Sequence, residues 1–568
     1  MLRLWKSCTS LSQLAQRRRD GPSRSLNLLV TSAFKFGGTL PHRNSTKSHS
    51  LHYLSRRFLH ASCRASASQQ AAVLDTDWGP VRSDAQRRTI YALSTPAGKG
   101  GVAVIRISGP DALRVWQAVT RGVRSRSAQQ PVPWVAELRD VVDPVTKEKL
   151  DDGLVLFFKG PKSFTTEDVL ELQIHSGRAV LSAVLHALSK LPYCRPAQPG
   201  EFTRRAFEGG RLDLTQVEGL RDLIDADTDA QRRVAVNGAT GLQRARFDAL
   251  RAQILDCQMY VEGFIDFGED VDELGQIEML DEAHSRARNI IALIRSHLSD
   301  NRRGEILRSG ISLAIFGPPN AGKSSLFNFL AQRDAAIISP IPGTTRDVLT
   351  LTLDIGGLPV VLNDTAGMRR TTEDVVERIG VERAEDAVDN ADVSICVLSL
   401  ADIVNRAPNT KFELKIPDDV ANHLKHHTSF LLNKCDLVED LTLDELRQAL
   451  AHALPRVDLP SIWKVSLRNG DGTQVFLDGL AAILKERCAY SDAMTLEDSP
   501  LITEARHRDY LESAVKHLEE FTSFPLSHID IAAESLRYAA RAIGAVSGQG
   551  VSTEEVLGAI FASFCVGK

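Results

Sequence analysis

The eight residues Gly317–Ser324 fit the phosphate-loop pattern G-x-x-x-x-G-K-S/T. Its two glycines let the backbone curl so that N–H groups face a polyphosphate, and a following helix adds the positive end of its dipole. Lys323 can reach the β- and γ-phosphates, and the Ser324 hydroxyl can ligate Mg²⁺. The apolar run 311–316 predicts a strand before the loop, and residues 325–330 predict a helix after it. This context favours a nucleotide site over a chance glycine-rich turn.

Two later motifs indicate a guanine nucleotide. The segment 364–367, Asp-Thr-Ala-Gly, matches D-x-x-G, in which the carboxylate can hold Mg²⁺ through water and the glycine N–H can face a γ-phosphate. The segment 433–436, Asn-Lys-Cys-Asp, matches N-K-x-D. Its Asp436 can accept hydrogen bonds from both N1–H and the 2-amino group of guanine. Adenine lacks that pair of donors, so Asp436 predicts selection of GTP over ATP.

Each of these motifs follows a strand-like run, and the order matches a GTP-binding domain. Ser466 and Leu467 follow a further such run, where a guanine-contacting loop belongs. The predicted GTP site comprises Asn320, Ala321, Gly322, Lys323, Ser324, Ser325, Ser339, Thr344, Thr345, Asp364, Thr365, Ala366, Gly367, Asn433, Lys434, Asp436, Ser466 and Leu467. Ser324 and Thr345 supply the two hydroxyls expected on Mg²⁺. Met368 stands where Ras-like GTPases place a water-orienting Gln, so another group must act or hydrolysis is poor.

The elements that position these motifs suggest several domains in the 568 residues. Strand patterns alternate with helical ones over 86–205, which predicts a small α+β domain. Helical periodicity covers 206–308, strand patterns return at Ile311 and continue to about Ala482, and helical periodicity resumes from Thr503. We expect an α/β GTPase domain at 309–485 inserted between two parts of one helical domain, 206–308 and 486–568. Two unrelated helical modules are the alternative.

The first 74 residues differ in composition from the rest. They contain 12 of the 68 Lys and Arg residues but one of the 72 acidic residues, Asp20, and they are rich in Ser. This composition is typical of a mitochondrial transit peptide, removed before about Asp75. A basic arm that binds RNA is the alternative. The remainder has a net charge near −15, so bulk charge does not favour nucleic-acid binding.

Cysteine spacing and hydropathy exclude several classes of protein. The eight cysteines are scattered and include no C-x-x-C pair, which argues against a zinc site or a disulfide framework. No apolar run approaches 18 residues, so no transmembrane helix is expected. No G-x-G-x-x-G motif follows a strand, so we expect no flavin in this chain.

Several segments form a further set of motifs: Asn320 in the phosphate loop, Gly343–Asp347, Asp364–Arg369, Val376–Ala384, Ser163–Leu172, Pro199–Phe202 and the ending Phe564–Lys568. Through these segments the chain resembles the MnmE family of tRNA-modification GTPases, and its ending is similar to the family's C-x-G-K. The resemblance spans roughly 86–568. With the leader, the chain is similar to the mitochondrial form. This resemblance implies a K⁺-stimulated GTPase that hydrolyses GTP to GDP and phosphate and acts in the mitochondrial matrix.

The resemblance also assigns catalytic and ion-binding roles. Asn320 would ligate K⁺, together with Ser339, Ile341 and Thr344, and this cation would offset developing charge as an arginine finger does. Glu377 would orient the attacking water in place of the missing Gln. A solvated charge on a helix is the alternative for Glu377.

The family's N-terminal domain binds a formyl-tetrahydrofolate and supports a homodimer. Arg106, Glu171 and Lys568 match its folate contacts, and Arg211 replaces a Lys at the fourth, a change that is not neutral. Ordinary surface ion pairs are the alternative. Cys565 would lie near the modification site, or it is a buried small apolar residue.

The reaction implied installs an aminomethyl-linked group on carbon 5 of the wobble uridine of mitochondrial tRNA, of glycine- or taurine-derived type. The implied partner is a flavin enzyme of the MnmG type. The GTPase motifs alone also allow an assembly GTPase, for instance for the mitochondrial ribosome. A dynamin-like membrane GTPase would need a lipid-binding segment that the mature chain does not contain.

Overall fold

The computed structural model describes residues 88–122, 130–267, 273–332, 336–337, 351–362, 391–405, 412–421, 424, 428–438, 441–455, 461–491, 498–524, 528–550 and 554–567. The predicted leader 1–74 lies outside these residues. None of the described helices is long and apolar enough to cross a membrane.

The first part is a seven-stranded sheet ordered β3-β4-β5-β6-β2-β1-β7. Its strands are β1 (Thr89–Leu93), β2 (Ala103–Ser108), β3 (Thr120–Gly122), β4 (Glu137–Val142), β5 (Lys149–Phe158), β6 (Val169–Ile174) and β7 (Cys194–Pro196). Helices α3 (Ala112–Val119) and α4 (Arg178–Ser189) cover one face around a buried apolar core. Side chains alternate along a strand, so Ile105 and Ile107 join that core while Arg106 faces the other side.

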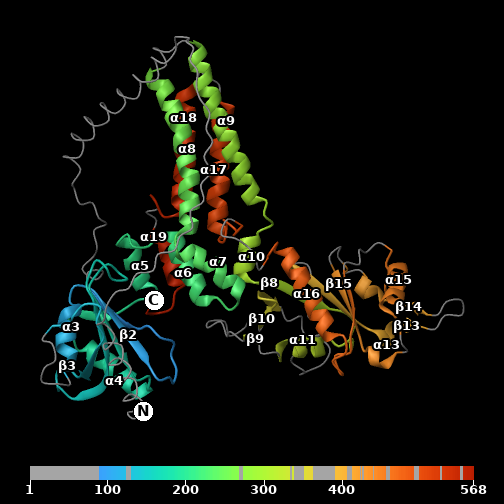
Figure 1. Cartoon of the computed structure of the whole chain (residues 1–568), viewed down its shortest axis with the longest axis horizontal. Helices are drawn as coiled ribbons and strands as arrows, with labels where there is room; N and C mark the ends of the chain where they lie inside the picture. Colours follow the sequence, from blue (N-terminus) through green and yellow to red (C-terminus); the bar gives the residue numbers. More distant parts are fainter. Residues whose placement is uncertain are drawn as a thin grey trace, which may run out of the picture. The chain divides into compact units, whose positions relative to one another are not determined.

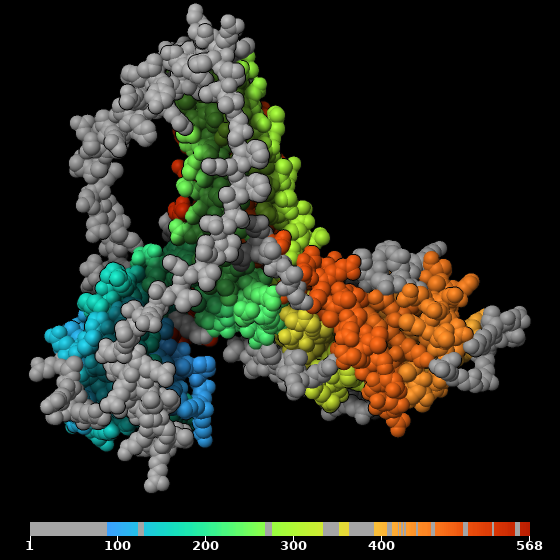
Figure 2. All heavy atoms as spheres, viewed as in Figure 1, coloured from blue at the N-terminus to red at the C-terminus, as the bar shows by residue number. Residues whose placement is uncertain are grey.

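The second part is helical and discontinuous in sequence. Its helices are α5 (Glu201–Glu208), α6 (Leu214–Asp225), α7 (Asp229–Ala239), α8 (Leu242–Phe267), α9 (Glu273–Leu298), α10 (Arg303–Ser309), α17 (Ala505–Ser523), α18 (Ile529–Val546) and α19 (Glu554–Ala562). The green α8 and red α17 and α18 come from distant parts of the chain, yet they pack together with α9 (Figure 1) around one apolar core. The surfaces of α8 and α9 adjoin along the bundle (Figure 2). One helical domain therefore forms from both sides of the GTP-binding part, as predicted, and the alternative of two unrelated helical modules is wrong.

The third part is a seven-stranded sheet ordered β16-β15-β12-β8-β11-β10-β9. Its strands are β8 (Ile311–Phe316), β9 (Ala336–Ile337), β10 (Leu351–Ile355), β11 (Leu358–Leu362), β12 (Val393–Ser399), β15 (Thr428–Asn433) and β16 (Ile462–Lys464). Other elements are α11 (Lys323–Ala331), α13 (Leu400–Ile403), β13 (Val404–Asn405), β14 (Glu413–Leu414), α14 (Asp418–Ala421), the 3₁₀-helix η3 (Cys435–Leu437), α15 (Leu443–Ala453) and α16 (Thr473–Arg487). The strands from β16 to β11 are mutually parallel, so their carboxyl ends share one edge.

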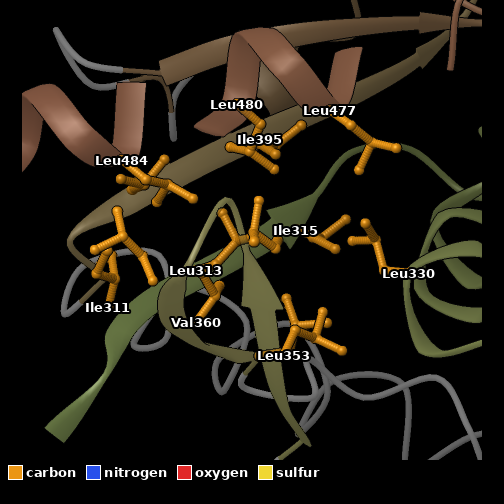
Figure 3. Close-up of a cluster of buried hydrophobic side chains, with 14 of the residues drawn as sticks. Ile311, Leu313, Ile315, Leu330, Leu353, Val360, Ile395, Leu477, Leu480 and Leu484 are labelled. Atoms are coloured by element: carbon orange, nitrogen blue, oxygen red, sulfur yellow. The ribbon is translucent and has the colours of Figure 1, made fainter. Parts of the chain in front are cut away.

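The expectation of strand patterns up to about Ala482 is wrong at its end. Residues 473–487 form α16, because Phe476, Leu480 and Leu484 recur at helical spacing and are buried. Leu480 and Leu484 point toward Leu313 and Ile395 of the sheet (Figure 3). An α+β domain, a discontinuous helical domain and an inserted α/β GTP-binding domain together confirm the predicted fold class.

Candidate functional site

The phosphate loop follows β8 at the carboxyl edge of the parallel strands and leads into α11. Gly317 has φ 140°, and a Cβ there would lie 2.1 Å from the Val397 carbonyl oxygen of β12. Gly322 has φ 108° immediately before the helix. Both positions therefore require glycine, as a loop that approaches a ligand with bare backbone must. Asn320 takes the left-handed conformation as well, with φ 59°.

Lys323 begins α11 and folds back over its own loop. Its Nζ donates hydrogen bonds to the carbonyl oxygens of Gly317 at 2.8 Å and Pro318 at 2.9 Å. Burial lowers the pKa of this ammonium group from its usual value. The loop thus holds a partly desolvated cation at the start of a helix, where an anion is favoured.

The guanine-recognition segments meet the phosphate loop through Asn433, the last residue of β15. Its Nδ2 donates to the Ala321 carbonyl oxygen at 2.9 Å, and its Oδ1 accepts from the Leu467 backbone N–H at 3.2 Å. One buried carboxamide therefore ties together loops that follow β8, β15 and β16. These loops are adjacent because β8, β12, β15 and β16 are neighbouring parallel strands.

Asp436 lies on η3 and is oriented by the loop after β16. Its Oδ1 accepts a hydrogen bond from the Ser466 hydroxyl at 2.6 Å. Ser466 is fixed in turn by backbone bonds to Asp471 and Gly470. Lys434, at φ 61°, pairs with Asp402 of α13 at 3.6 Å. No motif in the sequence indicated Asp402, since only the tertiary fold brings α13 beside η3.

Several predicted residues lie outside the described residues. They are Ser339, Ile341, Thr344, Thr345, Asp364, Thr365, Ala366, Gly367, Met368, Glu377 and Lys568. Among the residues that are described, no group of three or more His, Cys, Asp or Glu side chains could hold a metal ion. Ser324 and Ser325 are exposed in the first turn of α11, and Asn320 is exposed in the loop.

A second polar site lies on the α+β domain, on the face away from α3 and α4. Arg106 of β2 and Glu171 of β6 are cross-strand partners, and Arg106 Nε donates to Glu171 Oε1 at 3.0 Å. The guanidinium lies 5.4 Å from the ring centroid of Phe164 and 5.8 Å from that of Phe202. The pair is about four-fifths buried, with 23% and 17% of the side chains exposed, so it is not an ordinary surface pair.

A buried ion-pair network links the two segments that carry these rings. Glu167, close to Phe164 in sequence, accepts from Arg205 Nη1 at 2.9 Å and from the Ser108 hydroxyl at 2.8 Å. Arg205 belongs to α5, as does Phe202, and only 4% of its side chain is exposed. Sequence reasoning missed Arg205, because nothing in its local pattern distinguishes it from a solvated helix residue.

The C-terminal segment docks beside this site. The Ser94 hydroxyl donates to the Gly567 carbonyl oxygen at 2.9 Å, and Val566 forms a β-bridge with Pro199. Gly567 has φ 96°, and a Cβ there would lie 2.0 Å from the Leu93 carbonyl oxygen. The segment therefore ends against β1, the strand next to β2.

The remaining predicted residues of this site differ in placement. Arg211 is exposed, and its backbone N–H donates to Ala206 O at 2.9 Å just after α5. Cys565 is an exposed free thiol, so its interpretation as a buried apolar residue is wrong.

Comparison with known protein families gives two matches that together span residues 89–565. A family model described as the GTP-binding protein TrmE N-terminus matches residues 89–211, and the MnmE helical domain matches residues 214–565. A mitochondrial 5-taurinomethyluridine tRNA synthase subunit from Danio rerio is 42% identical over 490 residues, or 84% of this chain and 93% of that protein.

Bacterial relatives are similar over their whole length. The tRNA modification GTPase MnmE of Parvibaculum lavamentivorans is 43% identical over 489 residues, and that of Rickettsia akari is 37% identical over 481 residues. Each match covers 84% of this chain and 100% of the relative. The glycine-bounded phosphate loop, the guanine-recognition loops and these matches agree, and the chain belongs to the MnmE family of tRNA modification GTPases.

Proposed function

We propose that this protein hydrolyses GTP to drive modification of carbon 5 of the wobble uridine in mitochondrial tRNA. The observation that carries the proposal is that one chain combines the Asn433-centred nucleotide site with a largely buried Arg106–Glu171 site, beside which its own C-terminal segment docks. The first site supplies a GTP-dependent step, and the second supplies a guanidinium group beside two aromatic rings. The substituent is of the carboxymethylaminomethyl or taurinomethyl type, and the name of the Danio rerio relative favours the latter.

At the nucleotide site, Asp436 and Ser466 read the guanine edge, and Lys323 exchanges its loop carbonyls for phosphate oxygens. Ser324 and Thr345 would hold Mg²⁺, and Asn320, Ser339, Ile341 and Thr344 would hold K⁺. The exposed Ser324 and Asn320 at a glycine-shaped loop fit these roles. These cations supply charge stabilisation when the phosphoryl group transfers. Glu377 orients water by accepting a hydrogen bond from it.

At the second site, Arg106, Glu171, Arg211 and Lys568 would hold a formyl-tetrahydrofolate. A charged guanidinium beside two aromatic rings suits a ligand that carries both a planar ring and carboxylates. Cys565, exposed on the docked segment, lies near this ligand. Titration calorimetry with 5-formyltetrahydrofolate tests the assignment, since Arg106→Ala should abolish binding while Arg244→Ala, whose side chain pairs with Asp248 on α8, should not.

We propose that the α+β domain also forms a homodimer. Leu138 and Leu154 are cross-strand partners on β4 and β5, yet 54% and 43% of their surfaces are exposed. Trp134, 56% exposed, packs edge-on against Phe158 at 5.0 Å from the same part of the sheet. Such a patch suits an interface between two copies. Sedimentation equilibrium of the Leu154→Lys variant should show a monomer. An unchanged dimer would refute the assignment of this patch as the dimer interface.

The other proposals concern location, partner and domain division. The leader directs the chain to the mitochondrial matrix. The names of the relatives from Danio rerio and Dictyostelium discoideum, which describe both as mitochondrial, support this proposal. A fluorescent fusion of the chain that lacks residues 1–74 should lose the mitochondrial signal expected of the full-chain fusion.

A flavin-dependent protein of the MnmG type completes the activity. The working division is leader 1–74, α+β domain 86–205, helical parts 206–308 and 486–568, and GTPase domain 309–485.

One experiment tests the reaction itself. Deletion of the gene should remove the carbon-5 substituent from mitochondrial tRNA uridine, measured by mass spectrometry of nucleosides. Expression of the wild type should restore it, whereas Arg106→Ala should not. Normal nucleosides together with defective ribosome assembly in the deletion strain would favour the assembly-GTPase alternative.

A further inference from the structure

Four side chains form a closed ring of ion pairs where the GTP-binding domain joins the helical domain. We call Arg221, Asp222, Arg308 and Glu504 the root cluster. Arg308 donates to Asp222 Oδ1 at 2.8 Å and to Glu504 Oε2 at 2.9 Å. Arg221 donates to Asp222 Oδ1 at 3.2 Å and also to Glu504. Between 15% and 31% of each side chain is exposed, so solvent screens the ring only in part.

The root cluster lies on both chain connections of the GTP-binding domain. Arg308 is in the last turn of α10, three residues before the start of β8, the strand that leads into the phosphate loop. Glu504 is the N-cap of α17, where the chain re-enters the helical domain. A Cβ on Gly304 of α10 would lie 2.0 Å from the Ile502 carbonyl oxygen, so the two connections are in direct contact. A shift at either connection therefore acts on Arg221 and Asp222 of α6.

Arg221 has one further contact, and it reaches the C-terminal segment. Its Nη1 donates to the Ser563 hydroxyl oxygen at 3.2 Å, while that hydroxyl donates to the Ile560 carbonyl oxygen at 2.6 Å. Ser563 follows α19 directly, and Phe564 next to it packs with Val217 of α6. Three residues beyond Ser563 the chain reaches Val566, which bridges Pro199 beside the Arg106–Glu171 site.

We propose that Arg221 is a positioning residue. It couples the root cluster to the C-terminal segment and so holds this segment at the Arg106–Glu171 site. Its guanidinium serves two carboxylates and the Ser563 hydroxyl at once, so any rearrangement of Arg308 or Glu504 changes how firmly it holds Ser563. The nucleotide state would in this way set the position of residues 563–567. The effect of this positioning on tRNA modification rests on the proposed function. The link between the root cluster and residues 563–567 does not.

The test measures the rate at which the exposed Cys565 thiol of the full-length protein is alkylated, read from its peptide by mass spectrometry. Cys194 serves as a slow internal reference, because burial raises the pKa of its thiol to about 12. In the wild type, the Cys565 rate should differ at least about threefold between the GDP-bound protein and the protein with a non-hydrolysable GTP analogue. An equal rate in the two states would overturn the proposal.

Two variants separate positioning from folding. Ser563→Ala keeps the whole root cluster but removes the contact to the segment, so its GDP-state rate should rise about fivefold and lose its nucleotide dependence at an unchanged GTPase rate. Arg221→Lys should fall between Ser563→Ala and wild type, because an ammonium cannot serve all three acceptors. Arg537→Gln removes a matched surface pair with Glu262 and should behave as wild type. A wild-type response from Ser563→Ala would refute the role of Arg221.

A parallel titration with 5-formyltetrahydrofolate keeps the two proposals distinguishable. Absence of folate binding with nucleotide-dependent alkylation would overturn the folate assignment and support the link. Normal folate binding together with nucleotide-independent alkylation of Cys565 would support the folate assignment and overturn the link.

Discussion

The side-chain amide of Asn433 occupies the space that a Cβ on Gly322 would need, since the two atoms would lie 2.1 Å apart. The phosphate loop and the N-K-x-D segment, more than 100 residues apart in sequence, therefore fit together only because one position is glycine and the other a small carboxamide. This contact joins the two motifs into a single structural unit.

Asn433→Ala should weaken GTP binding, because Asn433 joins the phosphate loop to the guanine-recognition loops. The change removes the bonds to Ala321 O and from Leu467 N–H, each worth about 1 kcal/mol, so affinity should fall about 30-fold. Titration with a fluorescent GDP analogue measures this. Asn328→Ala, on the exposed face of α11, is the matched control and should bind as wild type. Equal affinities in the two variants would contradict the bridging role.

Asp436→Asn should change which base is preferred. The carboxylate accepts two hydrogen bonds from guanine, while an amide can donate one to the 2-oxo group of xanthine. The Ser466 hydroxyl donates to Asp436 at 2.6 Å and can donate equally to an amide oxygen, so the side-chain orientation should persist. Competition binding should show GTP affinity reduced and xanthosine triphosphate affinity raised, by about 10-fold or more each. If the wild type bound ATP as tightly as GTP, the assignment of Asp436 would be wrong.

Stability in acid should depend on a buried carboxylate in the helical domain. Glu218 accepts from Arg506 Nη2 and contacts His507 Nε2, both at 2.9 Å. Burial acts to raise the pKa of Glu218, but the charges and hydrogen bonds of His507 and Arg506 outweigh it and lower the pKa to about 2. The folded pKa lies below the unfolded value of about 4.3, so the contribution to stability is complete above the unfolded pKa and is lost as pH falls toward 2.

Glu218→Gln should therefore flatten the pH dependence between about pH 5 and pH 2 while it destabilises the protein near neutrality. The neutral-pH loss should be about 3 kcal/mol, because Arg506 is left with an unpaired, largely buried charge. Urea unfolding followed by circular dichroism across this range measures both effects. Glu282→Gln, which breaks an exposed pair with Arg286 on α9, should leave the curve unchanged.

The sequence predicted the parts of the site that a local pattern can encode. The phosphate loop needs its glycines and flanking strand within a dozen residues, so the motif gave its structure directly. Strand β4 is hard to recognise from the sequence, because Arg139 and Asp140 interrupt its apolar pattern, although Arg139 is 4% exposed and its guanidinium lies 4.2 Å from the centroid of the Trp116 ring. The partners of Arg221 were equally hidden, since α6, α10 and the start of α17 meet only in the tertiary fold.

We expect hydrolysis to depend on the cation, because Met368 cannot orient water as a Gln does and the proposed mechanism relies on a K⁺ ion. Intrinsic hydrolysis should be slow in Na⁺ and faster in K⁺, because Na⁺ is smaller and would bridge Asn320 and the other proposed ligands, Ser339, Ile341 and Thr344, poorly. A charge-stabilising cation that acts like an arginine finger contributes about 10³-fold or more, and a water-orienting carboxylate on the order of 10²-fold. Pairing of two GTPase domains should accompany the gain in K⁺.

Two variants divide these contributions. Glu377→Ala should bind GTP normally and lose most K⁺-stimulated turnover, because water is no longer oriented while the cation remains. Asn320→Ala should lose the response to K⁺ itself, and Asn328→Ala on the neighbouring helix should retain it. The measurement is the GTPase rate in KCl and NaCl at matched ionic strength, with light scattering to follow pairing of the domains. Equal wild-type rates in both salts, or a fully active Glu377→Ala, would remove this mechanism and leave a GTP-binding switch whose hydrolysis depends on another group.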